Sequence, residues 1–254
     1  MILDSFRLDG KVALVSGSSR GIGQGAAIAL AEAGAEVALL DRGDASGTAD
    51  RIRALGRRVH PIRRDFASAT PQELADAVTE AVAELGGLDI LVNNAGTIRR
   101  APAVEYPAGD WEDVLTVNLD AVFHLSQAAG RHMIAQGSGR IINVASMLSF
   151  QGGVFVPAYT ASKHAVAGLT KALANEWAVS GVTVNAVAPG YMATDNTAAL
   201  RADAEREASI VSRIPAGRWG TAADLQGVFV FLASDAAAYV TGAVVPVDGG
   251  WLVR

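Results

Sequence analysis

The sequence has no cysteine among its 254 residues. This absence excludes disulfide bridges, thiolate metal ligands and a cysteine nucleophile, and it fits a reducing compartment. Aromatic residues make up 6% of the chain and charged residues 19%, while half of the chain is hydrophobic. Such a chain can bury a substantial core, so a mainly disordered state is excluded.

The sequence also lacks a long apolar run and an excess of basic charge. No stretch reaches the ~18 consecutive apolar residues of a membrane span, and the start of the chain, Met1 to Asp9, lacks a basic region followed by an apolar one. We therefore expect a cytoplasmic protein. Its 26 acidic and 21 basic residues give a net charge of −5, which disfavours a general binder of nucleic acid or of anionic membranes.

Short β-branched or leucine-rich runs alternate with alanine-rich segments of helical length. This alternation is typical of βαβ units around a parallel sheet. Most of the runs are too apolar for one solvated face, so helices should cover both faces. We expect about seven strands, at Val12–Val15, Glu36–Leu40, Arg58–Ile62, Asp89–Val92, Arg140–Val144, Thr183–Val187 and Val244–Val247. We expect helices to start near Ile22, Ser46, Pro71, Trp111, Pro157 and Ala222.

No composition break or long linker divides the chain, which predicts one doubly wound α/β domain of Rossmann type over residues 1–254. The part up to about residue 145 would hold a cofactor, and residues 146–254 would carry catalysis and substrate binding. Residues 191–221 are long enough for a loop with its own short helix. This segment is either a mobile lid or a permanently packed excursion.

Three glycines crowd the turn after the first strand, in Ser16-Gly17-Ser18-Ser19-Arg20-Gly21-Ile22-Gly23. Glycine tolerates positive φ and lets the backbone approach a diphosphate, whose charge then faces the free amides of the next helix. A G-x-G-x-x-A pattern alone is weak, but this one lies in the first strand-to-helix turn and an acid, Asp41, ends the next strand. The arrangement predicts a dinucleotide site.

The residue types around Asp41 bear on which dinucleotide binds. Its carboxylate can accept hydrogen bonds from both ribose hydroxyls, which favours NAD(H). A 2′-phosphate would meet repulsion of ~4 kcal/mol per charge pair at ~4 Å and an effective dielectric of ~20. Arg20 and Arg42 can offset that repulsion, so NADP(H) stays an alternative.

A phenol and an ammonium share one helix face in Tyr159-Thr160-Ala161-Ser162-Lys163, because they stand at i and i+4. The charge of a nearby lysine can lower a tyrosine pKa of ~10 toward neutrality in a partly desolvated site. Ser146 lies just past the carboxyl end of the strand that ends at Val144, where its hydroxyl can donate to a developing alkoxide. These residues predict acid–base chemistry beside the dinucleotide.

With these motifs in this order, the sequence resembles the classical short-chain dehydrogenase/reductase family over essentially its whole length. The markers are the glycine turn, Asp65 after the third strand, Asn93-Asn94-Ala95-Gly96, Asn118, Ser146, Tyr159, Lys163, and Pro189-Gly190 with Thr194. Ser16 stands where the family usually has threonine. Because serine keeps a hydroxyl there, we expect little consequence.

The resemblance implies a role for each marker. Tyr159 would be the general acid/base, Ser146 would polarise the reacting oxygen, and Lys163 would hold the nicotinamide ribose and lower the tyrosine pKa. Asn118 would position a water that relays the proton, although Asn93, Asn94 and Asn118 can instead satisfy buried backbone groups. The implied cofactor site consists of Gly17, Ser19, Arg20, Gly21, Ile22, Gly23, Asp41, Arg42, Asp65, Phe66, Asn93, Ala95, Gly96, Tyr159, Lys163, Pro189, Gly190, Met192 and Thr194.

Residues 93–100, 146–153, 189–197 and 213–220 resemble the branch of the family that acts on acidic sugars. Arg99 and Arg100 follow the fourth strand at its carboxyl end, so one of them can pair bidentately with a carboxylate, although both can also be solvated loop arginines. The predicted substrate contacts are Arg99, Ser146, Gln151 and Tyr159. His124, His132 and His164 form no cluster in the sequence, so we expect no metal site.

The sequence thus predicts an NAD(P)-dependent oxidoreductase that acts on a secondary alcohol or ketone of a sugar acid. A reductase of carrier-bound 3-oxoacyl groups would share every catalytic residue, and a non-catalytic dinucleotide sensor would share the fold. The apolar end of the chain, residues 244–254 with Trp251, would by resemblance pack at an interface of a homotetramer. Packing over its own sheet is the alternative.

Overall fold

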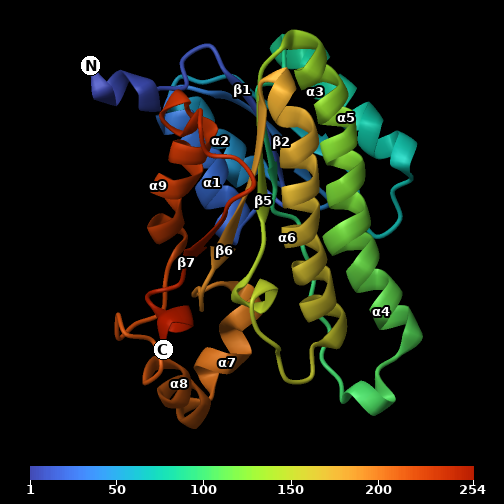
Figure 1. Cartoon of the computed structure of the whole chain (residues 1–254), viewed down its shortest axis with the longest axis vertical. Coiled ribbons are helices and arrows are strands. Elements are labelled where there is room, and N and C mark those ends of the chain that lie inside the picture. The colour runs from blue at the N-terminus through green and yellow to red at the C-terminus, as the bar shows by residue number, and fades with distance from the viewer.

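A computed structural model gives the fold and describes residues 1–195 and 197–254. Seven strands in these ranges form one sheet in the order β3-β2-β1-β4-β5-β6-β7, and every neighbouring pair is parallel (Figure 1). The prediction of seven strands is confirmed, with each bound within two residues of the predicted one. They are β1 (Val12–Ser16), β2 (Glu36–Asp41), β3 (Val59–Arg63), β4 (Ile90–Asn93), β5 (Gly139–Val144), β6 (Val182–Pro189) and β7 (Val244–Val247).

Helices cover both faces of the sheet, as predicted (Figure 1). One face carries α1 (Gly21–Glu32), α2 (Ser46–Ala54) and α9 (Ala222–Ala233), and the other carries α3 (Pro71–Leu85), α5 (Ala121–Gln136) and α6 (Pro157–Trp177). Successive side chains of β1 point to opposite faces of the sheet and so contribute to the hydrophobic core on each face. Ala13 and Val15 face α1, while Val12 and Leu14 face α3 and α5. The chain is therefore a single doubly wound α/β domain.

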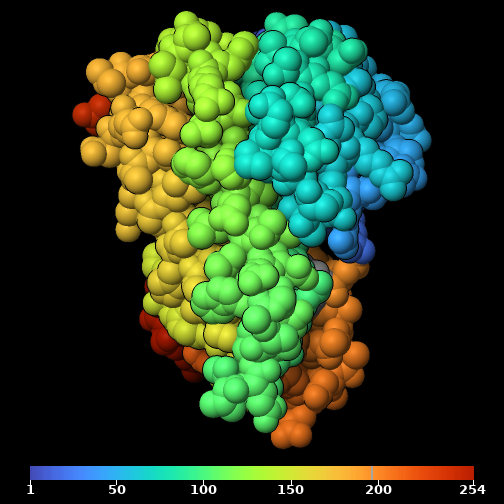
Figure 2. All heavy atoms as spheres, turned by 90° about the vertical axis from the view of Figure 1, so that its right-hand side faces the viewer, coloured from blue at the N-terminus to red at the C-terminus, as the bar shows by residue number. Residues whose placement is uncertain are grey.

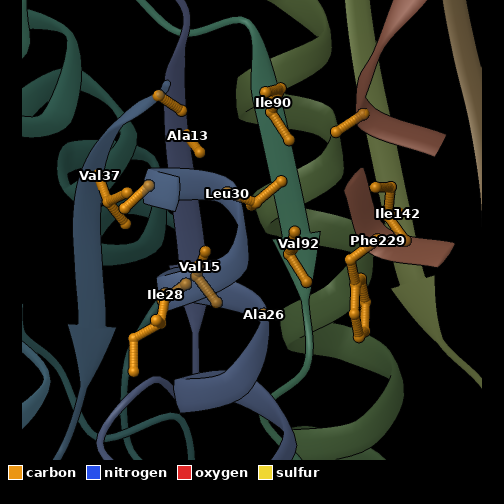
Figure 3. Close-up of a cluster of buried hydrophobic side chains, with 14 of the residues drawn as sticks. Ala13, Val15, Ala26, Ile28, Leu30, Val37, Ile90, Val92, Ile142 and Phe229 are labelled. Carbon is orange, nitrogen blue, oxygen red and sulfur yellow. The ribbon is translucent and has the colours of Figure 1, made fainter. Parts of the chain in front are cut away.

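The core beneath α1 and α9 fixes where the glycine turn lies. Figure 3 shows Ile28 and Leu30 of α1 packed toward Val15 and Val37 of the sheet, with Phe229 of α9 in the same cluster. Phe229 is fully buried, and burial of such a side chain contributes about 1.5–3 kcal/mol. This core therefore holds α1, the helix that follows the glycine turn, against the sheet and α9.

The helix expected near Trp111 starts at Ala108, three residues earlier than predicted. α4 (Ala108–Leu115) begins behind Pro107 and continues through a π-helical turn, Thr116–Asp120, into α5. The three segments form one ridge, green in Figure 2, down that side of the molecule. A π-turn inserts a residue into the helical repeat and so obscures the period read from the sequence. The other five predicted helix starts agree with the structure to within one residue.

The segment between β6 and α9 lies beyond the carboxyl ends of the strands (Figure 1). It holds two short helices, α7 (Ala198–Ala202) and α8 (Ala204–Val211), where the sequence predicted one. Ile210, Ile214 and Trp219 of this segment pack with Trp251 near the C-terminus. In this structure the segment is packed, and its action as a lid stays a prediction. Within the described residues, none of the helices has both the length and the apolar character that crossing a membrane requires.

Candidate active site

The loops after β1 and β4 meet at the point where the strand order reverses, which is where open parallel sheets form a ligand crevice. The hydroxyl of Ser16 accepts hydrogen bonds from the backbone N–H groups of Asn94 (3.0 Å) and Ala95 (3.1 Å). The side-chain amide of Asn94 donates to the carbonyls of Ser16 and Gly17, both at 3.0 Å. These bonds hold the glycine turn against the loop after β4, and serine supplies the hydroxyl that they need.

The glycine turn leaves room for backbone only. Gly17 and Gly21 have φ of 65° and 58°, which L-residues with side chains rarely adopt. A Cβ on Gly17 would lie 2.8 Å from the Asn94 amide nitrogen, and a Cβ on Gly23 would lie 2.1 Å from the Gly17 carbonyl oxygen. α1 begins without a side-chain cap, so its first N–H groups and its positive dipole end are open to a diphosphate.

A cleft of about 770 Å³ opens in front of this turn. It brings together fourteen of the predicted cofactor residues: Gly17, Ser19, Arg20, Gly21, Ile22, Asp41, Arg42, Asp65, Phe66, Ala95, Gly96, Tyr159, Lys163 and Thr194. The predicted substrate residue Arg99 lines it too. The sequence analysis missed Gly43, Asp44, Ala67, Asn94, Thr97, Ile98, Asp113, Val117, Val144 and Asp195 as lining residues. Most of them directly follow or precede a predicted one, and this adjacency is the signal that could have found them.

Some predicted residues lie behind the cleft rather than along it. Asn93 is buried, and its amide donates to Ser126 Oγ and Asn143 Oδ1, both at 2.9 Å. A Cβ on Gly190 would lie 2.5 Å from Asp248 Cα, so glycine there permits close packing. The predicted cofactor residues outside the lining are Gly23, Asn93, Pro189, Gly190 and Met192.

Asp41 ends β2 with its carboxylate facing the cleft, although the residue is only 8% exposed. Its Oδ2 accepts the N–H of Ser19 and its Oδ1 accepts the N–H of Gly43, both at 2.9 Å. A carboxylate oxygen has two lone pairs, so each still has capacity for a ribose hydroxyl. Asp41 thereby ties the glycine turn to the loop after β2.

Tyr159 and Lys163 lie on one face of the first turns of α6, as their spacing predicts, and both line the cleft. Lys163 is 4% exposed and its Nζ donates to the carbonyl of Val144 at 2.6 Å. Burial lowers the pKa of Lys163 to about 8. The ammonium lies 5.6 Å from the centre of the Tyr159 ring.

The structure differs from the expectation for the tyrosine. Burial raises the pKa of Tyr159, and a hydrogen bond with Ser146 and the charge of Arg100 only partly oppose this effect. The lowering by Lys163 that the resemblance implies stays a prediction for the cofactor-bound protein, since in the chain alone the Lys163 ammonium donates to the Val144 carbonyl. In this state the phenol keeps its proton and is a hydrogen-bond donor.

Ser146 hydrogen-bonds with the phenol of Tyr159, and neither Ser146 nor Asn118 belongs to the lining of the cleft. Ser146 Oγ accepts the N–H of Leu148 at 3.1 Å, which leaves its own O–H to hydrogen-bond with the Tyr159 phenol. Asn118 lies buried in the π-helical turn. Its amide oxygen accepts the N–H of Thr97 (2.8 Å), and its amide nitrogen donates to the Thr97 carbonyl (2.9 Å) and to Ser162 Oγ (3.2 Å). The side chain of Asn118 thus fastens the loop after β4 to α6.

The structure separates the two candidate substrate arginines. Arg99 Nε lies 3.5 Å from Asp110, and a terminal nitrogen of the same guanidinium lies 3.7 Å from Asp113. The positive charge of Arg99 is therefore largely balanced by these two carboxylates of α4. The positive charge of Arg100 lowers the pKa of Tyr159, although Arg100, unlike Arg99, lies outside the lining of the cleft. Gln151, the other predicted substrate contact, lies outside the lining of the cleft.

Comparisons with known proteins agree with this geometry. Residues 17–252 match the family model of enoyl-(acyl carrier protein) reductase. The chain is 53% identical over 255 residues to 2-dehydro-3-deoxy-D-gluconate 5-dehydrogenase of Escherichia coli (strain K12), with 100% of both chains covered. A crystal structure from Agrobacterium tumefaciens with bound NADP is 53% identical and has a TM-score of 0.93, covering 99% of this chain and 100% of that one. A gluconate 5-dehydrogenase from Burkholderia cenocepacia J2315, in complex with NADP and tartrate, is 43% identical with a TM-score of 0.95, covering 100% of both chains.

Proposed function

Because this chain belongs to the short-chain dehydrogenase/reductase family, we propose that it transfers a hydride reversibly between a nicotinamide cofactor and a secondary alcohol or ketone of a sugar acid. The proposed substrate is 2-dehydro-3-deoxy-D-gluconate or 2-deoxy-D-gluconate. The observation that carries the proposal is one cleft that joins the glycine turn to Tyr159 and Lys163. The identity of 53% to a dehydrogenase of the first compound supports this substrate class.

The residues of the cleft fit a dinucleotide. The turn from Ser19 to Ile22 would hold the diphosphate, Asp41 the adenosine ribose, and Asp65 with Phe66 the adenine. Lys163 and Thr194 would hold the nicotinamide end, where the bound group supplies or accepts the hydride. NAD(H) is the favoured cofactor because Asp41 keeps acceptor capacity at the ribose. NADP(H) is the alternative, which relatives with bound NADP support.

The side chains around the reacting oxygen would move the proton. During reduction, the Tyr159 hydroxyl would donate to the carbonyl oxygen, and during oxidation the phenolate would take the proton of the alcohol. The O–H of Ser146 would donate to the same oxygen and stabilise developing negative charge. Lys163, charged below a pH of about 8, would favour the phenolate once formed. A water held near Asn118 would carry the proton outward.

A sugar acid also needs a partner for its carboxylate, and Arg99 and Arg100 are the two candidates. Arg99 lines the cleft but is paired with Asp110 and Asp113, whereas Arg100 lies outside the lining and its charge lowers the pKa of Tyr159. An arginine fork binds a carboxylate with two parallel hydrogen bonds. A second candidate function is gluconate 5-dehydrogenase, favoured by the relative of that name that binds tartrate, itself a hydroxy acid.

A cytoplasmic homotetramer is the assembly that we propose. Large apolar or aromatic side chains near the C-terminus, Tyr239 and Val253, are 103% and 86% exposed in the single chain. Surfaces of this kind commonly mark subunit contacts. In contrast, Trp251 is buried within its own chain, so it contributes to folding before any assembly. Light scattering on the purified protein tests the oligomeric state.

A substrate screen tests the function. Purified protein would be offered aldonic and deoxy-keto acids with NAD and with NADP, and nicotinamide absorbance would be followed. We expect turnover of a hexonate, and a loss of at least ~10²-fold in Tyr159→Phe with nucleotide binding retained. Turnover of 3-oxoacyl thioesters without any hexonate would favour the acyl reductase instead. Nucleotide binding with no turnover in the whole panel would favour a sensor.

A further inference from the structure

An ion pair crosses the mouth of the cleft between two segments that are far apart in the sequence. Arg20, in the glycine turn, places a guanidinium nitrogen 3.0 Å from Oδ2 of Asp195. Asp195 follows Thr194 directly, at the start of the segment that carries α7 and α8. Both residues of the pair line the cleft.

The backbone of Arg20 lies beside the acid expected at the adenosine ribose. The preceding residue, Ser19, donates its N–H to Asp41 Oδ2 at 2.9 Å. From that position the flexible side chain of Arg20 can extend either toward the ribose end of the cleft or toward the segment that begins with Asp195. A phosphate on the ribose 2′-oxygen would lie next to the negative charge of Asp41 and would need cations there. Arg42, which also lines this part of the cleft, is the other candidate cation.

We propose that Asp195 is a specificity-determining residue, which draws the Arg20 guanidinium across the cleft and withholds it from a 2′-phosphate. This inference rests on the proposed function, because it assumes that an adenine dinucleotide occupies the cleft. Asp195 acts in two ways, since it occupies the Arg20 donors and adds a negative charge beside them. Its presence biases the site toward NAD(H).

The expected bias is modest. The side chains of Arg20 and Asp195 are 71% and 72% exposed, so solvent screens their attraction. Loss of an exposed pair changes an equilibrium by about two- to fivefold. A 2′-phosphate can therefore still recruit Arg20 by displacing Asp195, and the site discriminates between the two dinucleotides without excluding either.

Titration of the protein with two cofactor fragments tests the inference without any turnover. Adenosine 2′,5′-bisphosphate carries the 2′-phosphate, and adenosine 5′-monophosphate is the matched ligand without it. Calorimetry at low ionic strength should show that Asp195→Asn lowers the Kd of the bisphosphate about two- to fivefold. The Kd of the monophosphate should change less, because it lacks the 2′-phosphate, so the ratio of the two constants is the readout.

Two further variants separate the ion pair from a general charge effect. Glu205→Gln removes one negative charge from α8 in the same segment, at an exposed position, and should leave the ratio unchanged. In an Arg20→Gln background, Asp195→Asn should no longer alter the ratio. A persistent effect in that background, or an equal shift for both ligands, would overturn the inference. If neither fragment bound to the unaltered protein, that result would contradict the proposed dinucleotide site itself.

Discussion

Lys163 lies one helical turn after Tyr159, with its ammonium 5.6 Å from the centre of the phenol ring and its hydrogen bond directed at the Val144 carbonyl. The helix that carries both is fastened to β5 by a buried hydrogen bond of 2.9 Å from the Asn143 amide to Thr170 Oγ1. The ammonium is therefore placed by the fold, before any cofactor enters.

The buried Lys163 should make the stability of the cofactor-free protein depend on alkaline pH. Its pKa is lowered from 10.5 to about 8 in the folded state, so between these values the unfolded chain binds the extra proton. The unfolding free energy should therefore rise from pH 8 to pH 10.5, by up to about 3 kcal/mol from this group. Urea unfolding of the protein and of Lys163→Met at several pH values isolates the contribution. A difference between them that did not vary with pH would contradict the assignment.

Substitution of Gly23 should damage the dinucleotide turn. Gly23→Ala would place a Cβ 2.1 Å from the Gly17 carbonyl oxygen, and relief of such a clash requires movement of the turn. We expect a loss of about 1–3 kcal/mol in unfolding free energy and a marked loss of adenosine 5′-monophosphate binding. Gly47→Ala is the matched control, because a Cβ on this α2 residue meets no atom within 4 Å. It should be neutral or stabilising by up to ~1 kcal/mol.

Arg100 and Arg99 should differ sharply in their effect on substrate affinity. A charge-assisted hydrogen bond contributes about 1.5–3 kcal/mol, so Arg100→Gln should raise the KM for a hexonate by at least ~10-fold. Arg99→Gln should have a much smaller effect, because Asp110 and Asp113 already hold this guanidinium. Steady-state kinetics on the two variants, with circular dichroism to confirm folding, compares them. Equal effects would show that the arginines are not separated in function.

The acid at the start of α9 should contribute stability that is lost at low pH. The Arg218 guanidinium, bound to both oxygens of Asp224 at 2.7 and 2.9 Å, and the N–H of Thr221 hold the pKa of this carboxyl well below its usual range. The contribution is present above pH ~4 and disappears as acid protonates the carboxylate. Asp224→Asn should therefore lower the unfolding free energy by ~1 kcal/mol at pH 7, and by progressively less below pH 4. A loss of the same size at pH 7 and at pH 2.5, measured by thermal unfolding, would refute this account.

The sequence predicted the sheet well because buried parallel strands are short, nearly continuous apolar runs that hardly depend on their surroundings. It placed the start of α4 near Trp111 instead of Ala108, because Ala108, Gly109 and Asp110 carry no large apolar side chain that marks a helical period. Polar residues in the segment with α7 and α8 obscured two helices, whose apolar side becomes evident only when Ile210 packs on the tryptophans near the C-terminus.

For the candidate site, spacing along the chain located the loops but not the directions of their side chains. Adjacent residues Arg99 and Arg100 have different surroundings because the backbone path of a loop sets where each side chain points. In the same way, no sequence pattern shows that Lys163 donates to the Val144 carbonyl, since the two groups come from different elements. Contacts between side chains of different helices, strands and loops set the pKa values in the site, and these contacts become known only with the fold.

The two ends of the segment with α7 and α8 are joined by a parallel bridge between Met192 and Gly220, in which Ala193 donates to the Gly220 carbonyl at 2.8 Å and Gly220 donates to the Tyr191 carbonyl at 2.9 Å. The chain therefore leaves and re-enters the domain at one place. Stretches closed in this way tolerate insertion, deletion and replacement between their ends, because the sheet does not depend on what lies there. Exchange of this stretch for that of a relative should therefore leave the sheet intact, while it changes the part of the cleft that Thr194 and Asp195 line.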